Sequence, residues 1–217
     1  MLKVNNIHFS YDNGARLLDG VSLDVDAGDV VWVQGDNGSG KSTLLRIMAQ
    51  LTDYEGIIVY NGKNVRGDHS YLREVVYLPP DPYLFDYLSG YENARFLLNV
   101  FAVLKSDYAK FEKYASEFGI ADDLHRHVQE YSLGMRHKLF WSAMLARNAT
   151  LWLLDEPFSS FDASTQRFVE GLLKEMTARG ISVILVTHID DIGTRLATRC
   201  IRLEGGHLLD NVKKGGM

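Results

Sequence analysis

The sequence predicts an α/β domain with a mainly parallel sheet, an N-terminal antiparallel β-subdomain and an inserted α-helical subdomain. Three observations lead to this class. Short continuous apolar runs, typical of strands buried on both faces, alternate with stretches of helical periodicity, and that alternation favours parallel strands. A glycine-rich stretch joins one apolar run directly to a helix. The middle of the chain, from about residue 89 to 148, is mostly helical in pattern.

The N-terminal part is expected to consist mainly of strands. The stretches "KVNNIHFSY" and "VSLDVDAGD" predict strands, the second because apolar and polar residues alternate up to a Gly-Asp end. "VVWVQG" predicts a fully buried strand, and "KSTLLRIMAQL" after the glycine-rich stretch predicts an apolar-periodic helix. "GIIVYNGKNV" predicts a hairpin around Asn61 and Gly62.

The helical block and the C-terminal part follow. "YENARFLLNVFAVL" and "DYAKFEKYASEFGI" carry apolar residues three and four positions apart. "LWLLDEP" and "ISVILVTH" predict buried strands separated by a helix from about Ser164 to Arg179, and "RCIRLEGGHLLDNV" predicts a closing hairpin. We therefore expect one domain over 1–217. Its core and β-subdomain occupy about 1–80 and 149–217, and its helical subdomain about 81–148.

Composition excludes several classes of protein. A hydrophobic fraction of 46% with 24% charged residues is ordinary for a globular chain, and a net charge of −5 argues against a nucleic-acid partner. Cys200 is the only cysteine, so no disulfide framework is expected, and a reducing cytoplasmic setting fits best. No signal peptide is expected, and every apolar run is shorter than the roughly 20 residues of a membrane span. Any membrane role is expected to come through a partner.

The glycine-rich stretch "GDNGSGKST" fits the phosphate-loop pattern G-x-x-x-x-G-K-[ST] between a strand and a helix. Its glycines allow backbone N–H groups to surround a phosphate chain at a helix N-terminus. Lys41 is expected to reach the β- and γ-phosphates of ATP, and the Ser42 hydroxyl to bind Mg²⁺. The expected ATP-binding residues here are Gly35, Asp36, Asn37, Gly38, Ser39, Gly40, Lys41, Ser42 and Thr43.

Three polar side chains follow two other buried strands. Asp155 and Glu156 come directly after "LWLL", and His188 ends "VILVTH". Strand ends in open α/β sheets are where ligands bind. We expect Asp155 to hold Mg²⁺ directly or through water, Glu156 to polarise the attacking water, and His188 to contact the γ-phosphate.

With these motifs in this order, the whole chain resembles the ATP-binding subunit of an ABC transporter, a phosphate-loop ATPase with a RecA-like core. By resemblance, Tyr11 stacks on the adenine. "YSLGMRHKL" resembles the family's signature LSGGQ, with Ser132, Leu133, Gly134 and Met135 in its last four positions. This variant is similar to those of bacterial ABC-2-type exporter ATPases, which implies export.

The resemblance also implies an assembly. "SSFD" takes the place of the family's D-loop, which gives that role to Asp162. In the family two subunits pack head to tail, so that each ATP lies between one phosphate loop and the other subunit's signature. The expected partners are a second ATPase subunit, most simply an identical one, and an integral membrane permease. The expected location is the cytoplasmic face of the cell membrane.

One segment departs from the family pattern. "YLPPDPYLF", residues 77–85 and here called the proline arm, contains three of the four prolines. The family's glutamine that touches Mg²⁺ and water falls on Pro80, whose side chain forms no hydrogen bond. Either Asp81 takes over a water-mediated Mg²⁺ contact, or nothing does and the arm is a rigid lever. Repulsion between a carboxylate and the γ-phosphate favours the lever.

Two further questions stay open on sequence alone. The aromatic side chains of "YLFDYL" (Tyr83, Leu84, Phe85, Tyr87, Leu88) either plug the helical subdomain or line a groove for a helix of the membrane subunit. The alternative function is a non-transport ABC ATPase that acts as a mechanical switch on a membrane-anchored or soluble complex. The transported substrate is not encoded in this chain, because its contacts belong to the permease.

Overall fold

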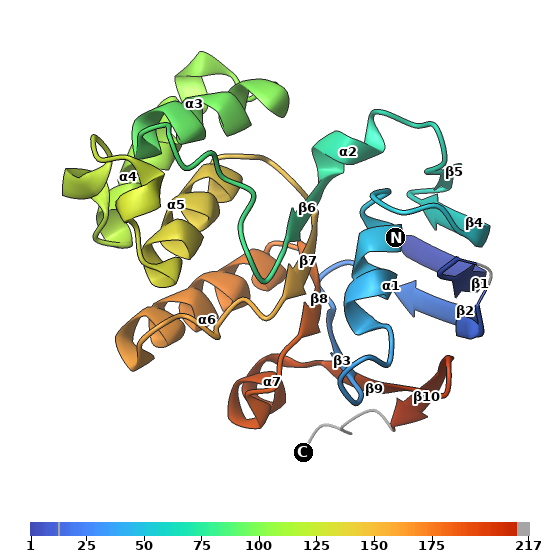
Figure 1. Cartoon of the computed structure of the whole chain (residues 1–217). Coiled ribbons are helices and arrows are strands. Elements are labelled where there is room, and N and C mark those ends of the chain that lie inside the picture. The colour runs from blue at the N-terminus through green and yellow to red at the C-terminus, as the bar shows by residue number, and fades with distance from the viewer. Residues whose placement is uncertain (13, 212–217) are drawn as a thin grey trace.

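The computed structural model describes residues 1–12 and 14–211, and a six-stranded sheet runs through its middle (Figure 1). The strand order is β10-β9-β3-β8-β7-β6. The parallel strands are β3 (Val30–Gln34), β6 (Val75–Leu78), β7 (Leu151–Asp155), β8 (Ser182–Val186) and β9 (Arg199–Glu204). Strand β10 (His207–Asn211) returns antiparallel to β9, as the closing hairpin predicted. The expectation of a mainly parallel sheet is confirmed.

A second, antiparallel sheet has the order β2-β1-β4-β5. Its strands are β1 (Leu2–Ser10), β2 (Arg16–Val25), β4 (Glu55–Tyr60) and β5 (Lys63–Asn64). The expectation of a strand over 21–29 was wrong at both ends. Pairing of Ser10 with Arg16 extends β2 towards the N-terminus, and a turn closed by Asp29 N–H on the Asp26 carbonyl ends it. The hairpin at Asn61 and Gly62 forms as predicted, with positive φ at both residues.

The strands β3, β7 and β8 are buried on both faces, which is why they read as continuous apolar runs. Along β7, Leu151 and Leu153 pack with α1 (Lys41–Met48) and the antiparallel sheet. Trp152 and Leu154 face the opposite way, into the core formed with the helices. The helices on that side are α3 (Gly90–Val100), α4 (Tyr108–Glu117), α5 (Leu133–Leu145), α6 (Ala163–Ala178) and α7 (Asp190–Leu196).

The helical segment between β6 and β7 packs as one layer beside the sheet (Figure 1). Trp141 of α5 stacks on Trp152 of β7 with ring centroids 5.4 Å apart, which joins that layer to the sheet. Three short elements were not predicted, namely the four-residue helix α2 (Tyr71–Glu74), the strand β6 that follows it, and α7. Within residues 1–12 and 14–211, no helix is long and apolar enough to cross a membrane.

Candidate active site

A cavity of about 540 Å³ lies where the chain leaves β3, β7 and β8. That position is where open α/β sheets bind ligands. Its walls come from six separate segments of the chain, and the lining residues are Tyr11, Leu17, Asn37, Gly38, Gly40, Lys41, Ser42, Thr43, Pro80, Asp155, Glu156, Val186 and His188. The fold therefore brings most of the expected nucleotide and catalytic residues to one place. Leu17 and Val186 were not foreseen.

The phosphate loop curls tightly between β3 and α1. At Gly35, φ is 150°, and an added Cβ would collide with the Leu203 carbonyl, so only glycine fits. The Lys41 ammonium lies inside the curl and donates to the carbonyl oxygens of Gly35 (2.7 Å) and Asp36 (2.9 Å). Gly40 caps α1 in the left-handed region, so the first N–H groups of the helix border the cavity. A curled backbone at a helix N-terminus is suited to phosphate.

Asp155 and Ser42 form a small oxygen cluster at the cavity floor. Burial raises the pKa of the Asp155 carboxyl, while hydrogen bonds from Ser42 and Tyr77 lower it again. The Tyr77 hydroxyl donates to Asp155 Oδ2 at 3.4 Å. A buried carboxylate beside a hydroxyl is the hard-oxygen set that Mg²⁺ prefers. No cluster of three or more His, Cys, Asp or Glu occurs among the described residues, so phosphate oxygens and water would complete the shell.

Glu156 turns sharply away from β7. Its φ is 52°, in the left-handed region where a side chain is strained, and its N–H donates to the Val186 carbonyl (2.9 Å). The turn directs its carboxylate at His188, whose backbone N–H donates to Glu156 Oε2 (3.3 Å). His188 Nε2 lies 3.4 Å from Glu156 Oε1 without hydrogen-bond alignment, and Oε1 is buried with no hydrogen-bond partner in the described structure. Burial raises the pKa of Glu156, as suits a group that orients water.

Tyr11 lies at the cavity mouth. It follows β1, its side chain is exposed, and its hydroxyl is 3.0 Å from Thr43 Oγ1. The ring packs edge-on against Phe9 at 4.7 Å between centroids. A fixed aromatic ring with a free face is suited to stacking on a base.

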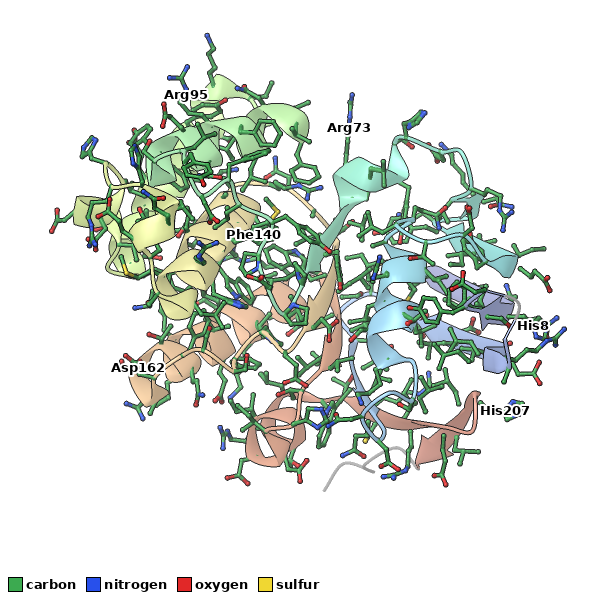
Figure 2. The ribbon with its side chains drawn as sticks, in the orientation of Figure 1. His8, Arg73, Arg95, Phe140, Asp162 and His207 are labelled. Atoms are coloured by element: carbon green, nitrogen blue, oxygen red, sulfur yellow. The ribbon has the colours of Figure 1, made fainter. Side chains whose placement is uncertain are left out.

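The signature residues Ser132, Leu133, Gly134 and Met135 do not line this cavity. Ser132 caps α5, with its hydroxyl accepting from Met135 N–H (3.2 Å). Asp162 does not line the cavity either. It caps α6 by accepting from Thr165 N–H (2.7 Å), and hydrogen bonds from Thr165 and Ser164 lower the pKa of Asp162 to about 2. In Figure 2 Asp162 lies at the start of α6, on the side of the molecule away from His8. Within one chain, the signature residues therefore lie outside the cavity that the phosphate loop lines.

The proline arm places Pro80 on the cavity wall, whereas Asp81 is exposed and does not line the cavity. The Pro80 carbonyl accepts a hydrogen bond from His137 Nε2 (2.9 Å). At the far end of the arm, the buried Asn93 amide accepts from Phe85 N–H (2.7 Å) and donates to the Phe85 carbonyl (3.0 Å). Sequence reasoning missed Tyr77, Asn93 and His137, because nothing in the motifs marks them.

The aromatic segment after the arm is divided between the core and the surface. Leu84 packs against the helical core, and Leu88 is half-buried. Tyr83, Phe85 and Tyr87 are exposed, Tyr87 at 82% of its surface. We call Tyr83, Phe85, Tyr87 and Phe96 the aromatic patch; all four are exposed, and Phe85 contacts Phe96 edge-on at 5.0 Å.

Comparison with known proteins finds relatives over almost the whole chain. The profile of the ABC transporter family matches residues 18–159. The cytochrome c biogenesis ATP-binding export protein CcmA of Vibrio cholerae is 32% identical over 205 residues, which cover 94% of this chain and 98% of that protein.

Solved structures agree on the fold. A structure of an ATP-binding subunit of an ABC transporter has a TM-score of 0.91 at 25% identity, over 99% of this chain and 90% of that one. A dimeric post-hydrolysis state of an ATP-binding cassette bound to ADP and phosphate has a TM-score of 0.87 at 24% identity and covers both chains fully. At 24% identity, the similarity to the second structure shows the fold alone.

Proposed function

Because the chain belongs to the ABC transporter family and is an ATPase of that family, we propose that it dimerises around two Mg·ATP and drives a separate membrane permease in export. The observation that carries the proposal is the cavity that gathers Lys41, Ser42, Asp155, Glu156 and His188. Within it, an acidic pair and a phosphate-binding loop face the same space. That combination suits hydrolysis of a nucleoside triphosphate.

We assign the steps of hydrolysis to these residues as follows. The loop N–H groups and Lys41 hold the β- and γ-phosphates, while Tyr11 stacks on the base. Ser42 and Asp155 would hold Mg²⁺, which neutralises phosphate charge when bound. Glu156, through its unpaired Oε1, orients the attacking water in line with the γ-phosphate, and His188 braces that phosphate.

The dimer is proposed because one chain holds only half of each site. Ser132 and the N-terminal end of α5 are suited to a phosphate, yet they lie outside the cavity of their own chain. A second copy packed head to tail would bring its Ser132 to the γ-phosphate. The structural relative in a dimeric state with ADP and phosphate has the fold this arrangement needs.

The membrane partner is proposed to dock on the aromatic patch. Neighbouring exposed aromatic side chains are typical of an interaction surface. The patch joins the proline arm to α3, so a cytoplasmic helix seated there could push on the arm. The export direction is supported by the signature variant and by the similarity to CcmA, an ATP-binding export protein. We place residues of about 81–148 in the helical subdomain, and the protein at the cytoplasmic face of the membrane.

Light scattering of the Glu156→Gln protein with and without Mg·ATP tests the proposal. We expect a monomer without nucleotide and a dimer with it, since the variant binds ATP but cannot orient water. The matched control Glu156→Gln with Ser132→Arg should stay monomeric, because the added guanidinium blocks the trans contact. A Glu156→Gln protein that stays monomeric in ATP would reject the dimer. Co-purification of a soluble protein instead of a polytopic membrane protein would favour the switch function over transport.

A further inference from the structure

His137 is a buried histidine that the proposed mechanism does not use. It lies on α5, five residues after Ser132, and none of its surface is exposed. Its Nε2 lies 2.9 Å from the Pro80 carbonyl oxygen. Because a carbonyl only accepts, Nε2 carries the proton and donates. Its Nδ1 is buried with no hydrogen-bond partner among the described residues, so the ring has a single polar contact.

The same stretch of α5 holds the chain beyond the proline arm as well. Arg136 pairs with the carboxylate of Asp86, the residue that follows the arm. Asp86 is in turn tied to the helical layer, since its carbonyl accepts from Gln129 N–H (2.9 Å). Two consecutive residues of α5 therefore hold this stretch of chain. His137 bonds to the cavity end of the proline arm, and Arg136 pairs with the residue directly after the arm.

The first turns of α5 also contact the SSFD segment. Gly134 packs so closely on the Ser160 carbonyl that an added Cβ would lie 2.9 Å from its oxygen. The His137 ring packs edge-on against Phe161, with ring centroids 5.9 Å apart. His137 thus lies on α5 and contacts two other segments, the proline arm and the SSFD segment that joins Glu156 to α6. In the proposed dimer, the arm lies beside one nucleotide and the start of α5 faces the other.

We propose that His137 is a positioning residue that ties the proline arm to the signature helix and the SSFD segment, so that the three move as one unit during ATP hydrolysis. The inference rests on the proposed function of the cavity. Tyr77 bonds the start of the arm to Asp155, but Pro80 offers no side-chain hydrogen bond and Asp81 does not line the cavity, so from Pro80 on the arm is not held from the nucleotide side. The arm is held from the protein side instead, through its backbone at His137. This favours the lever interpretation of the arm.

Two amide variants separate the hydrogen bond from mere packing. In His137→Gln the side-chain nitrogen takes the place of Nε2 and can still donate to the Pro80 carbonyl. In His137→Asn it takes the place of Nδ1 and cannot reach. We expect His137→Gln to keep kcat within about two-fold of wild type, and His137→Asn to lose about ten-fold in kcat with KM for ATP changed by less than about two-fold.

A second readout does not depend on hydrolysis. Amide hydrogen exchange of the nucleotide-free protein should speed up over residues 79–86 in His137→Asn and not in His137→Gln. Should His137→Asn fail to fold, His137→Leu, which fills the site without a donor, gives the same comparison with His137→Gln.

Equal kcat in the Gln and Asn variants, or equal loss of kcat and of melting temperature in both, would overturn the proposal, because packing alone would then explain the residue. Failure of the proposed function looks different. In that case Glu156→Gln would keep full turnover, while the exchange of the arm would still report on His137.

Discussion

Replacing Gly134 by alanine should weaken the protein even though alanine is the better helix former. Gly134 lies in the first turn of α5, where an added Cβ would be 2.9 Å from the backbone oxygen of Ser160. Ordinary contact begins near 3.4 Å, so α5 or the SSFD segment must retreat by about 0.5 Å. Neither can yield easily, because the obstacle is backbone and the neighbouring Phe161 is buried.

The magnitude follows from two opposing effects. Overpacking of this kind costs about 1–3 kcal/mol, and the gain in helix propensity from glycine to alanine returns at most about 1 kcal/mol. We therefore expect Gly134→Ala to lower the free energy of unfolding by about 1–2 kcal/mol. With a urea m-value of about 2 kcal/mol/M, the midpoint should fall by roughly 0.5–1 M.

Gly171 provides the matched control. It lies inside α6, and a Cβ there would meet nothing within 4 Å. Gly171→Ala should therefore raise the free energy of unfolding by about 0.5–1 kcal/mol. Urea unfolding of both nucleotide-free variants, followed by circular dichroism with m unchanged, makes the comparison. If Gly134→Ala is as stable as Gly171→Ala, the close contact between α5 and the SSFD segment does not exist as described.

Three further predictions concern the cavity. Tyr77→Phe removes a hydrogen bond to Asp155 and should raise the Mg²⁺ concentration needed for half-maximal turnover by several-fold, measured by Mg²⁺ titration at saturating ATP. An unchanged Mg²⁺ requirement would show that the 3.4 Å contact does not affect Mg²⁺ binding. Glu156→Gln should lower turnover at least about 100-fold and yet raise the melting temperature at pH 7. Burial raises the pKa of Glu156, so the folded state binds its proton more tightly than the unfolded state does, and the carboxylate destabilises the fold above that pKa. The gain should shrink as the pH falls towards the ordinary value of 4.5, and a gain independent of pH would count against this cause. Asp81→Ala should leave turnover within about two-fold of wild type, because the Asp81 side chain lies outside the cavity lining. A larger loss of turnover would indicate that Asp81 substitutes for the glutamine missing at Pro80.

Much of the fold and the core of the candidate site could be predicted because their signals are local. The phosphate loop is nine consecutive residues between a strand and a helix, and Asp155, Glu156 and His188 each end a continuous apolar run. A continuous apolar run of that kind predicts both the strand and its last residue, and strand ends form the edge of the sheet where ligands bind. The start of β2 at Arg16 was not predictable, because Leu17 and Leu18 are adjacent and Gly20 follows, so the first residues of the strand do not alternate.

The residues that position the site could not be predicted, because their partners are far away in the chain. Tyr77 meets Asp155 across 78 residues, and His137 meets Pro80 across 57. Pairings of this length depend on how β6 and α5 pack, which no short motif records. In the same way Asn93 looks like any polar residue of α3 until its amide is seen closing the turn at Phe85.

In the proposed dimer, one chain supplies the phosphate loop and the other the signature of each ATP site. Mixing two inactive variants tests this arrangement. Lys41→Ala removes the phosphate contact and Ser132→Arg blocks the trans contact, so each protein alone should hydrolyse ATP at a small fraction of the wild-type rate. A mixed dimer has one intact site, formed by the phosphate loop of the Ser132→Arg chain and the signature of the Lys41→Ala chain. Random pairing in an equimolar mixture makes half of the pairs mixed, so steady-state turnover should recover to about a quarter of wild type. A mixture no more active than the average of its two components would contradict sites shared between two chains.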